Sequence, residues 1–255
     1  MRNPIHRTVR LESIDRIRSD YAIISFRSEE MAGLSLPGNF FEVRAMQGLA
    51  ALPRLFKPIS LYNIEGSSIK LMIKSFGIET RKLIHMRPGD SLEVIGPLGN
   101  SFEIPERGMI ALISGGIGYP PLFYLRKKIP STCFSTWIHG GKHTEDIFPC
   151  DDAWTEDGSA GNKGLATQGL VNLIQNERID MVCACGPTPM LKAVAEICRR
   201  YDIALQVSME AYMACGVGVC HGCSIPIGKM SNWVYKRVCK DGAVFPGDQV
   251  RWELI

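Results

Sequence analysis

The first hundred residues alternate short apolar runs with polar turns. Clusters of turn-forming residues separate the runs, at Gly38-Asn39, Glu65-Gly66 and Pro88-Gly89-Asp90. Runs of β-branched and aromatic residues occupy positions 21–26, 41–46, 58–64 and 69–73. Runs of this kind between turns predict strands, and several closely spaced strands indicate a small antiparallel barrel. One short helix is expected inside this region, over residues 80–86.

The pattern changes after a polar stretch at 103–108, where we expect a domain boundary. Residues 109–114 are continuously apolar, as in a parallel strand that is buried on both faces. Strands are also expected at 135–141, 181–187 and 203–209, and helices at 120–128 and 190–202. Strands that alternate with helices predict an α/β nucleotide-binding domain. The polar residues 151–163 are expected to form a surface loop or a hairpin.

The chain from about residue 210 is rich in cysteine and looks irregular. So short a segment buries too little surface to fold on a hydrophobic core of its own, so a bound metal is expected to stabilise it. We therefore predict three parts: an antiparallel β-barrel over 1–105, an α/β domain over 106–209, and a small metal-stabilised domain over 210–255.

Composition excludes several classes of protein. Of the 255 residues, 45% are hydrophobic and 22% are charged, which argues against a disordered chain. The net charge, 29 − 26 = +3, is too small to predict nucleic acid or an anionic membrane as the main partner. The longest uncharged apolar stretch, 109–125, is interrupted by glycine and proline, so no membrane span is expected. The first residues lack the apolar region of a signal peptide, which favours a cytoplasmic location.

Nine cysteines in a cytoplasmic protein are not expected to form structural disulfides. Four of them follow the spacing C-x4-C-x2-C-x15-C, at Cys215, Cys220, Cys223 and Cys239. The first three match the plant-type arrangement that holds a [2Fe–2S] cluster, and the glycines between them let a loop fold tightly. Structural zinc usually takes two short cysteine pairs, whereas Cys239 stands alone. Zinc and simple buried thiols are therefore the weaker alternatives, and His221 is interpreted as a solvated loop residue.

Two turns in the α/β region have the context of a nucleotide site. The turn with Gly115, Gly116 and Gly118 follows a buried strand and opens a helix, as phosphate-binding turns do. It departs from G-x-G-x-x-G, and a plain strand–helix turn explains it equally well. Cys185, Gly186 and Pro187 also lie between a strand and a helix, where Gly186 would admit a flat nicotinamide ring. A nucleophilic role for Cys185 is disfavoured, since no histidine is placed as its base.

Several motifs occur together in one order along nearly the whole chain. They are PGNFFEVR (37–44), KPISLY (57–62), FGIETRKL (76–83), GPLGNSF (96–102), SGGIGYPPLFYL (114–125), CGPTPML (185–191) and the cysteine cluster. This series resembles the ferredoxin-reductase superfamily. The segments SMEAYMACGVGVCHGC and VCKDGAVF are especially similar to the electron-transfer subunits of class 1B, NAD-dependent dihydroorotate dehydrogenases.

The resemblance implies an FAD-binding barrel over 1–105, a Rossmann-like NAD-binding domain over 106–209 and a [2Fe–2S] domain over 210–255. The residues that match flavin-lining strands are Lys57, Pro58, Ile59 and Ser60, followed by Ile73, Lys74 and Ser75. Glu79 and Thr80 match a Gly-Thr pair beside the FAD pyrophosphate. NAD(H) is expected at Gly115, Gly116, Gly118, Cys185, Gly186 and Pro187.

Two departures from this family affect the expected phosphate contacts. Lysine stands at position 57, where the family usually has arginine, and it cannot form a bidentate contact with a phosphate. Glu79 replaces a glycine and would repel a pyrophosphate unless its side chain points away. Arg54 and Arg81 are the candidates to compensate.

The resemblance also implies a function as an oxidoreductase subunit. Electrons would pass between an FMN-containing dihydroorotate dehydrogenase subunit and NAD⁺, through the cluster and FAD, in pyrimidine (UMP) biosynthesis. The expected assembly is a heterotetramer with two copies of each subunit, docked near Val219 and His221. One alternative is a similar module that serves a sulfite reductase-like or ferredoxin-linked partner, although the x15 gap favours the first reading. Another is a zinc-stabilised binding module. No substrate-oxidising site is expected in this chain itself.

Overall fold

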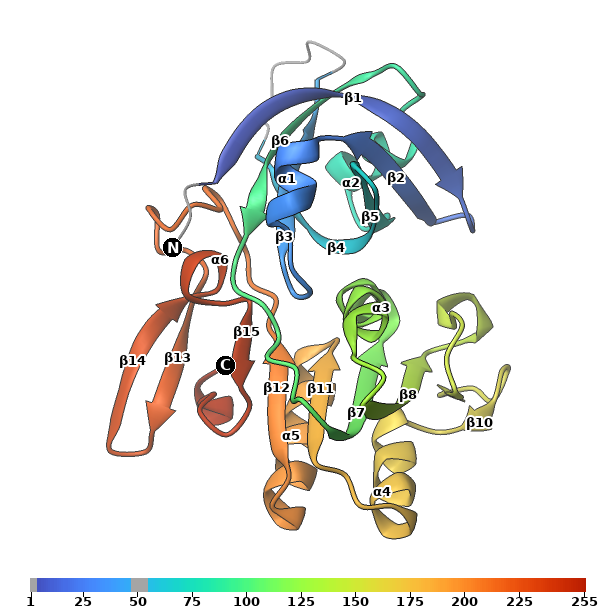
Figure 1. Ribbon diagram of the computed structural model, residues 1–255, viewed down its shortest axis with the longest axis vertical. Helices are drawn as coiled ribbons and strands as arrows, with labels where there is room; N and C mark the ends of the chain where they lie inside the picture. Colours follow the sequence, from blue (N-terminus) through green and yellow to red (C-terminus); the bar gives the residue numbers. More distant parts are fainter. Residues whose placement is uncertain (1–3, 47–54) are drawn as a thin grey trace.

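The computed structural model describes residues 4–46 and 55–255. Figure 1 shows a barrel at one end, a layered sheet at the other, and the C-terminal segment beside the sheet. This arrangement confirms the predicted combination of a barrel with an α/β unit. No helix in either described range is long and apolar enough to span a membrane.

The barrel is closed by six antiparallel strands in the order β1-β2-β5-β4-β3-β6. The strands are β1 (Ile5–Arg16), β2 (Tyr21–Arg27), β3 (Phe40–Ala45), β4 (Lys57–Glu65), β5 (Ser68–Lys74) and β6 (Ser91–Leu98). Two helices accompany them, α1 (Glu29–Leu34) and α2 (Ile78–Ile84). Side chains of alternate strand residues fill the interior, where the rings of Phe26 and Phe41 meet edge to face at 5.8 Å.

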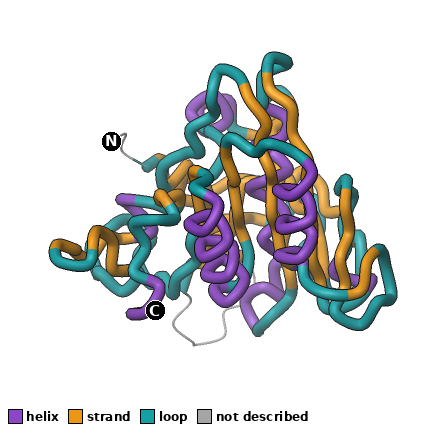
Figure 2. Tube along the Cα trace, turned by 90° about the horizontal axis from the view of Figure 1, so that it is seen from below, coloured by secondary structure: helices purple, strands orange, loops and turns teal. Residues whose placement is uncertain are grey.

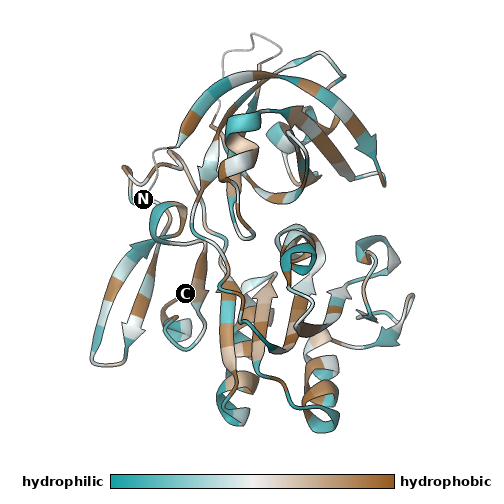
Figure 3. Cartoon of the chain, in the orientation of Figure 1, coloured by the Kyte–Doolittle hydropathy of each residue, from teal (hydrophilic) through white to brown (hydrophobic). Residues whose placement is uncertain are grey.

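The second unit is a sheet of seven strands in the order β10-β9-β8-β7-β11-β12-β15. Six of its strands are β7 (Gly108–Gly115), β8 (Cys133–Gly141), β9 (Asp152–Thr155), β10 (Asn162–Lys163), β11 (Met181–Cys185) and β12 (Ala204–Ser208). The helices are α3 (Tyr119–Lys128), α4 (Ala166–Asn176) and α5 (Thr188–Tyr201), with short 3-10 turns η1 (Gly116–Gly118) and η2 (Thr144–Asp146). Figure 2 shows the helices packed against the strands, and Figure 3 shows the apolar residues gathered on the central strands.

The central strands run parallel, as the apolar pattern predicted, with Cys185 of β11 opposite Ser114 of β7. The hairpin alternative for residues 151–163 is wrong, because β9 and β10 pair in parallel. A parallel pair needs the chain to cross back between its strands, and a tight hairpin cannot do this.

The C-terminal segment is more regular than its sequence predicted. It forms an antiparallel hairpin of β13 (Ser224–Lys229) and β14 (Asn232–Arg237), then α6 (Val238–Asp241), β15 (Val244–Pro246) and the turn η3 (Trp252–Leu254). The hairpin projects from the body of the molecule (Figures 1 and 2). β15 instead joins the large sheet, antiparallel to β12 and with Phe245 opposite Val207. The segment is thus anchored in the neighbouring unit.

A chain of hydrogen bonds lies inside the α/β unit. The indole nitrogen of Trp137 donates to the Ser114 hydroxyl at 2.8 Å, and that oxygen lies 2.7 Å from Nδ1 of His139. Nε2 of His139 lies 2.9 Å from the backbone oxygen of Asp146 and donates to it. His139 is 0% exposed, and burial lowers the pKa of its imidazole to about 4. The network therefore requires a neutral imidazole with its proton on Nε2.

We expect this histidine to make the protein acid-labile. The unfolded state takes up a proton below pH 6.5, whereas the folded state does not until about pH 4, so stability is lost as the pH falls between these values. The full loss is on the order of 3 kcal/mol, of which about 2 kcal/mol is lost by pH 5. Urea unfolding at pH 7.5 and pH 5 measures this part. The His139→Gln protein should be less stable than the parent at pH 7.5, but its free energy of unfolding should depend less on pH. His85→Gln, at an exposed site, is the control and should behave like the parent. Equal pH dependence of the free energy of unfolding in all three chains would contradict the prediction.

Candidate functional site

A cleft of about 210 Å³ lies where the barrel, the sheet and the C-terminal segment meet. Most of the residues predicted to line a flavin do line this cleft: Lys57, Pro58, Ile59, Ser60, Ile73, Lys74 and Thr80. The α/β unit contributes Ile117 and Pro120, and the segment after β12 contributes Met209 and Met213. The cleft is therefore assembled from three distant parts of the sequence.

Two adjacent barrel strands supply the polar and apolar walls of the cleft. Ile59 of β4 and Ile73 of β5 are buried, whereas Lys57 and Lys74 are half-buried and add two basic side chains to the lining. Phe76, just after β5, is largely exposed and completes the apolar wall. Apolar walls with a few cations suit a flat aromatic ligand that carries phosphates.

Thr80 lies at the start of α2 and organises the turn before it. Its hydroxyl oxygen accepts hydrogen bonds from the backbone amides of Phe76, at 3.0 Å, and Gly77, at 3.1 Å. These bonds fix the backbone that bounds the cleft next to β5.

Two predicted residues do not line the cleft. The backbone amide of Ser75 donates to the carbonyl of Asp20 at 2.7 Å. Glu79 is not among the residues that line the cleft, and its carboxylate forms an ion pair with Lys82 at 3.1 Å that balances its charge. Arg81 is exposed on α2, and Arg54 lies outside the described residues.

The two glycine-containing turns of the α/β unit pack against each other at the carboxyl ends of β7 and β11. A Cβ on Gly118 would collide with the carbonyl of Cys185 and come within 2.7 Å of Gly186 Cα. Only glycine permits this approach of one backbone to the other. The space beside Gly116 is open, since a Cβ there would meet nothing within 4 Å. Gly116 is thus the member of its turn with room for a ligand.

The cleft does not extend to these glycines. Its lining residues include the neighbouring Ile117 and Pro120 but none of the six predicted NAD(H) residues. The thiol of Cys185 is buried, which raises its pKa above the ordinary value and disfavours a thiolate. This supports the reading of Cys185 as a packed turn residue and not a nucleophile.

Two contacts link the four cysteines predicted to bind a cluster into pairs. The sulfurs of Cys223 and Cys239 are 3.3 Å apart, and both residues are buried. In the other pair, the backbone amide of Cys220 donates to the sulfur of Cys215 at 3.4 Å. Although burial opposes it, backbone amide hydrogen bonds, those of Cys220 and Val217 foremost, lower the pKa of Cys215 to about 6. Thiolates are the form that binds iron.

Two pairs of cysteines suit two iron atoms better than a single ion. Burial, followed by the hydrogen bond with Cys223, raises the pKa of Cys239 to about 12, so iron has to displace the proton of this thiol when it binds. Within the described ranges, no three potential ligands gather closely enough to hold one metal ion. In a [2Fe–2S] cluster each iron takes two cysteines, and the donor set here is four thiols. The residues present therefore fit the predicted cluster.

The loop that carries three of the cysteines is held from two sides. Arg237 of β14 donates to the carbonyl of Gly218 at 2.9 Å and forms an ion pair with Asp241 at 3.1 Å. On the barrel side, Gly216 has φ +65° and packs so closely on Glu42 that a Cβ would lie 2.8 Å from its Cδ. Glycine is required here both by the backbone conformation and by the lack of space.

Glu42 links the cleft to this loop. It lies in β3 directly opposite Pro58 of the cleft wall, and neither carboxylate oxygen has a hydrogen-bond partner among the described residues. Burial, followed by the negative charge of Cys215, raises its pKa to about 7. Glu42 therefore contacts the cysteine loop at Gly216 and is paired, through its strand, with Pro58 of the cleft wall.

Some residues of the cleft were not predicted to line it. Phe40, Met209 and Met213 lie in motifs that carry the family resemblance but had no role assigned, and Met72 belongs to a barrel strand. Only the meeting of the three parts gives each of them a place in the site.

Comparison with known proteins agrees with the predicted cluster-binding segment and with the family resemblance. The family described as "Iron-sulfur cluster binding domain of dihydroorotate dehydrogenase B" matches residues 210–251. A protein of Caldanaerobacter subterraneus subsp. tengcongensis, "Dihydroorotate dehydrogenase B (NAD(+)), electron transfer subunit", is 36% identical, over 84% of this chain and 86% of its own. A Thermococcus kodakarensis protein with the same name, qualified as probable, is 35% identical over 96% and 98%.

Solved structures confirm the fold. The chain superposes on an NADH-dependent reduced ferredoxin-NADP oxidoreductase with a TM-score of 0.85, at 24% identity, over 96% of this chain and 90% of the other. The cytochrome b5 reductase domain of Ulva prolifera nitrate reductase gives a TM-score of 0.61, at 20% identity, over 74% and 89%. The similarity to the first of these includes the C-terminal segment, since it covers nearly the whole chain.

Proposed function

The chain belongs to the family of dihydroorotate dehydrogenase B electron-transfer subunits, and from this membership we propose that it carries electrons between a dihydroorotate-oxidising subunit and NAD⁺. It is an oxidoreductase subunit of pyrimidine biosynthesis. The observation that carries the proposal is the cleft shared by the barrel, the sheet and the segment that leads to the cysteine loop. The cleft is the proposed flavin site, and the two parts that carry the proposed nucleotide and cluster sites both contribute residues to its wall.

The residues around the cleft fit FAD. Lys57, Ser60, Thr80 and the isoleucines of β4 and β5 would hold it. The ion pair with Lys82 offsets the repulsion that Glu79 would otherwise exert on a pyrophosphate. NAD(H) would lie over Gly116 and the turn at Gly186, at the carboxyl edge of the sheet where α/β folds bind nucleotides.

The four cysteines of the two pairs would hold a [2Fe–2S] cluster. When bound, the flavin exchanges a hydride with nicotinamide and single electrons with the cluster. This chain's own residues bring the sites together: Glu42 and Gly216 seat the cysteine loop on β3, next to the wall of the cleft.

The proposed partner is an FMN-containing catalytic subunit, in a heterotetramer of two copies of each chain. Its docking surface is the exposed tip of the cysteine loop, where Val219 is 76% exposed and Cys220 and His221 face solvent. The proposed division into functional parts is 1–105 for FAD, 106–209 for NAD(H) and 210–255 for the cluster. The proposed location is the cytoplasm, where nine free cysteines stay reduced.

Anaerobic reconstitution tests this function. The purified chain is combined with the catalytic subunit from the same organism, and the reduction of NAD⁺ by dihydroorotate is followed by NADH absorbance. We expect NADH to form only when both chains are present, with flavin and iron in the purified complex. Flavin and iron without dihydroorotate-dependent NADH formation would assign the chain to a different redox partner, and a colourless chain would refute the proposal.

Arg237 gives a separate prediction about the cluster. Because it holds the carbonyl of Gly218, Arg237→Gln should release the loop and speed the loss of the cluster to a chelator by about 10-fold. The decay of cluster absorbance in anaerobic EDTA measures this rate. Lys236→Gln, at the exposed neighbouring position, is the matched control and should decay like the parent. Equal rates for the two variants would show that Arg237 does not hold the loop.

A further inference from the structure

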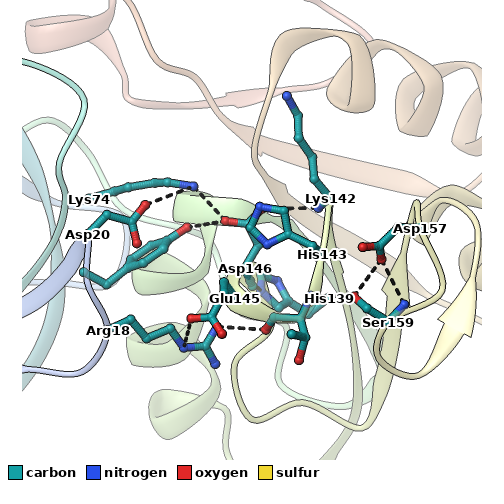
Figure 4. A network of polar contacts seen from close by, with 12 residues as sticks. Arg18, Asp20, Lys74, His139, Lys142, His143, Glu145, Asp146, Asp157 and Ser159 are labelled. Carbon is teal, nitrogen blue, oxygen red and sulfur yellow. Dashed lines mark hydrogen bonds and ion pairs between the residues drawn. The ribbon is translucent and has the colours of Figure 1, made fainter.

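One buried carboxylate joins the barrel to the α/β unit. Asp146, the last residue of η2, is 5% exposed. Its Oδ1 accepts hydrogen bonds from the Tyr21 hydroxyl at 2.8 Å and from the Lys74 ammonium at 2.7 Å. Tyr21 belongs to β2 and Lys74 to β5, so both donors come from the barrel. Figure 4 shows the side chain of Lys74 reaching Asp146.

A third barrel residue holds the same short segment. Arg18 donates to the carbonyl of Thr144 at 2.9 Å and to that of Ile147, and its guanidinium lies 4.7 Å from the centre of the Phe148 ring. Three side chains of one unit therefore hold four residues within the segment 144–148 of the other. We call Arg18, Tyr21, Lys74 and Asp146 the Asp146 contact.

The Asp146 contact is also tied to the interior of the α/β unit. Oδ2 of Asp146 accepts the backbone amide of Lys142 at 3.3 Å, and its carbonyl accepts Nε2 of His139. Because these bonds fix the carboxylate in direction as well as position, a rotation of the barrel relative to the sheet would break them.

The Asp146 contact has one residue beside the proposed flavin site and one beside the proposed nucleotide site. Lys74 lines the cleft, and its ammonium lies 5.5 Å from the centre of the Phe76 ring in the cleft wall. Asp146 follows β8, whose carboxyl end lies at the nucleotide edge of the sheet. The contact thus connects the proposed flavin wall directly to the proposed nucleotide edge.

A second contact between the units is apolar. The rings of Tyr62 of β4 and Phe123 of α3 stack at 4.3 Å. Stacked rings favour close packing but allow sliding, whereas hydrogen bonds to a buried carboxylate specify one arrangement. The stacking supplies attraction, and the Asp146 contact supplies the orientation.

We propose that Asp146 is a positioning residue that fixes the α/β unit against the barrel in the orientation needed for hydride transfer between nicotinamide and flavin. This inference rests on the proposed function. Hydride transfer needs the donor and acceptor carbon and nitrogen within about 3.5 Å, and a misplacement of 1 Å costs about 100-fold in rate.

The test compares Asp146→Asn with Asp202→Asn in the holoenzyme. Asn keeps the shape of the side chain and one acceptor but loses the charge that pairs with Lys74, and Asp202 is an exposed residue of the same unit at the end of α5. Stopped-flow mixing with NADH gives the limiting rate of flavin reduction and the dissociation constant of NADH. We expect Asp146→Asn to lower the limiting rate by about 10-fold or more with nearly unchanged NADH affinity. Asp202→Asn should match the parent.

Two further readouts separate positioning from a general loss of structure. Flavin and iron contents of Asp146→Asn should equal those of the parent, and the long-wavelength charge-transfer absorbance of nicotinamide stacked on reduced flavin should weaken. Tyr21→Phe, which removes one hydrogen bond and keeps the ring buried, should lower the limiting rate in the same direction by a smaller factor. The double variant should be no slower than Asp146→Asn, because both changes act through one contact.

The outcomes are distinct. An unchanged limiting rate in Asp146→Asn and Tyr21→Phe overturns the inference alone. A loss of FAD that accounts for the whole fall in rate also overturns it, since the residue would then serve stability only. If NADH fails to reduce the flavin of the parent protein, the proposed function fails and the inference fails with it.

Discussion

Replacing Cys239 by serine is expected to abolish the iron–sulfur cluster and leave the flavin bound. Cys239 is the only one of the four cysteines outside the loop, and its sulfur lies 3.3 Å from that of Cys223 in a buried pair. A serine there removes one of the four sulfur ligands that the cluster needs. Dihydroorotate-driven NAD⁺ reduction with the catalytic subunit should fall by about 100-fold or more.

Iron analysis, cluster absorbance and flavin content of the purified variant check this prediction. NADH-dependent reduction of a two-electron dye should persist, because that reaction needs no cluster. Cys150→Ser changes a half-buried cysteine outside the cluster and is the matched control. A Cys239→Ser protein with full iron content, or a Cys150→Ser protein that has lost its iron, would refute the assignment.

The second large effect is expected from Gly118→Ala. The added methyl group would meet the carbonyl of Cys185, which is backbone and cannot turn aside, so the two turns at the ends of β7 and β11 must separate. Overpacking of this kind costs about 1–3 kcal/mol. The displaced turns should also slow the reduction of flavin by NADH by about 10-fold or more.

Thermal unfolding and stopped-flow reduction by NADH measure the two effects of Gly118→Ala. The control is Gly33→Ala, in α1, where a Cβ meets nothing within 4 Å and the backbone is helical. That change should be neutral or slightly stabilising, because alanine has the higher helix propensity. Parent-like NADH kinetics in Gly118→Ala would mean that the turn does not take part in nucleotide binding.

The strands that the sequence predicted are those with continuous apolar or aromatic runs. β1 was not predicted, because its sequence, IHRTVRLESIDR, is largely polar and most of its side chains are exposed or half-buried. α4 was not predicted, because Gly169 interrupts its interior and lowers its helix propensity. The glycine is needed there, since a Cβ would lie 2.6 Å from the indole nitrogen of Trp154. In both cases tertiary packing outweighs the local signal.

The candidate site was also predictable from the sequence only in part. The cysteines were predictable because three of the four ligands share one loop, so that their spacing carries the geometry. The cleft was only partly predictable, because Met209 and Met213 reach it through the path of the chain after β12. The Asp146 contact had no sequence signal, since a lone aspartate in a polar loop gives no indication of a partner more than seventy residues away.

The short strand β15 protects the large sheet from self-association. It pairs with β12 through Gln206, Val207 and Ser208 and covers that flank of the sheet. An uncovered strand edge is a template for pairing with another chain. Because β15 lies just beyond Cys239 in the sequence, removal of the C-terminal segment would expose the edge of β12 as well as remove the four cysteines. The segment therefore acts as a cap against aggregation, and a chain cut before residue 210 is expected to be recovered as aggregates and not as a free two-unit reductase.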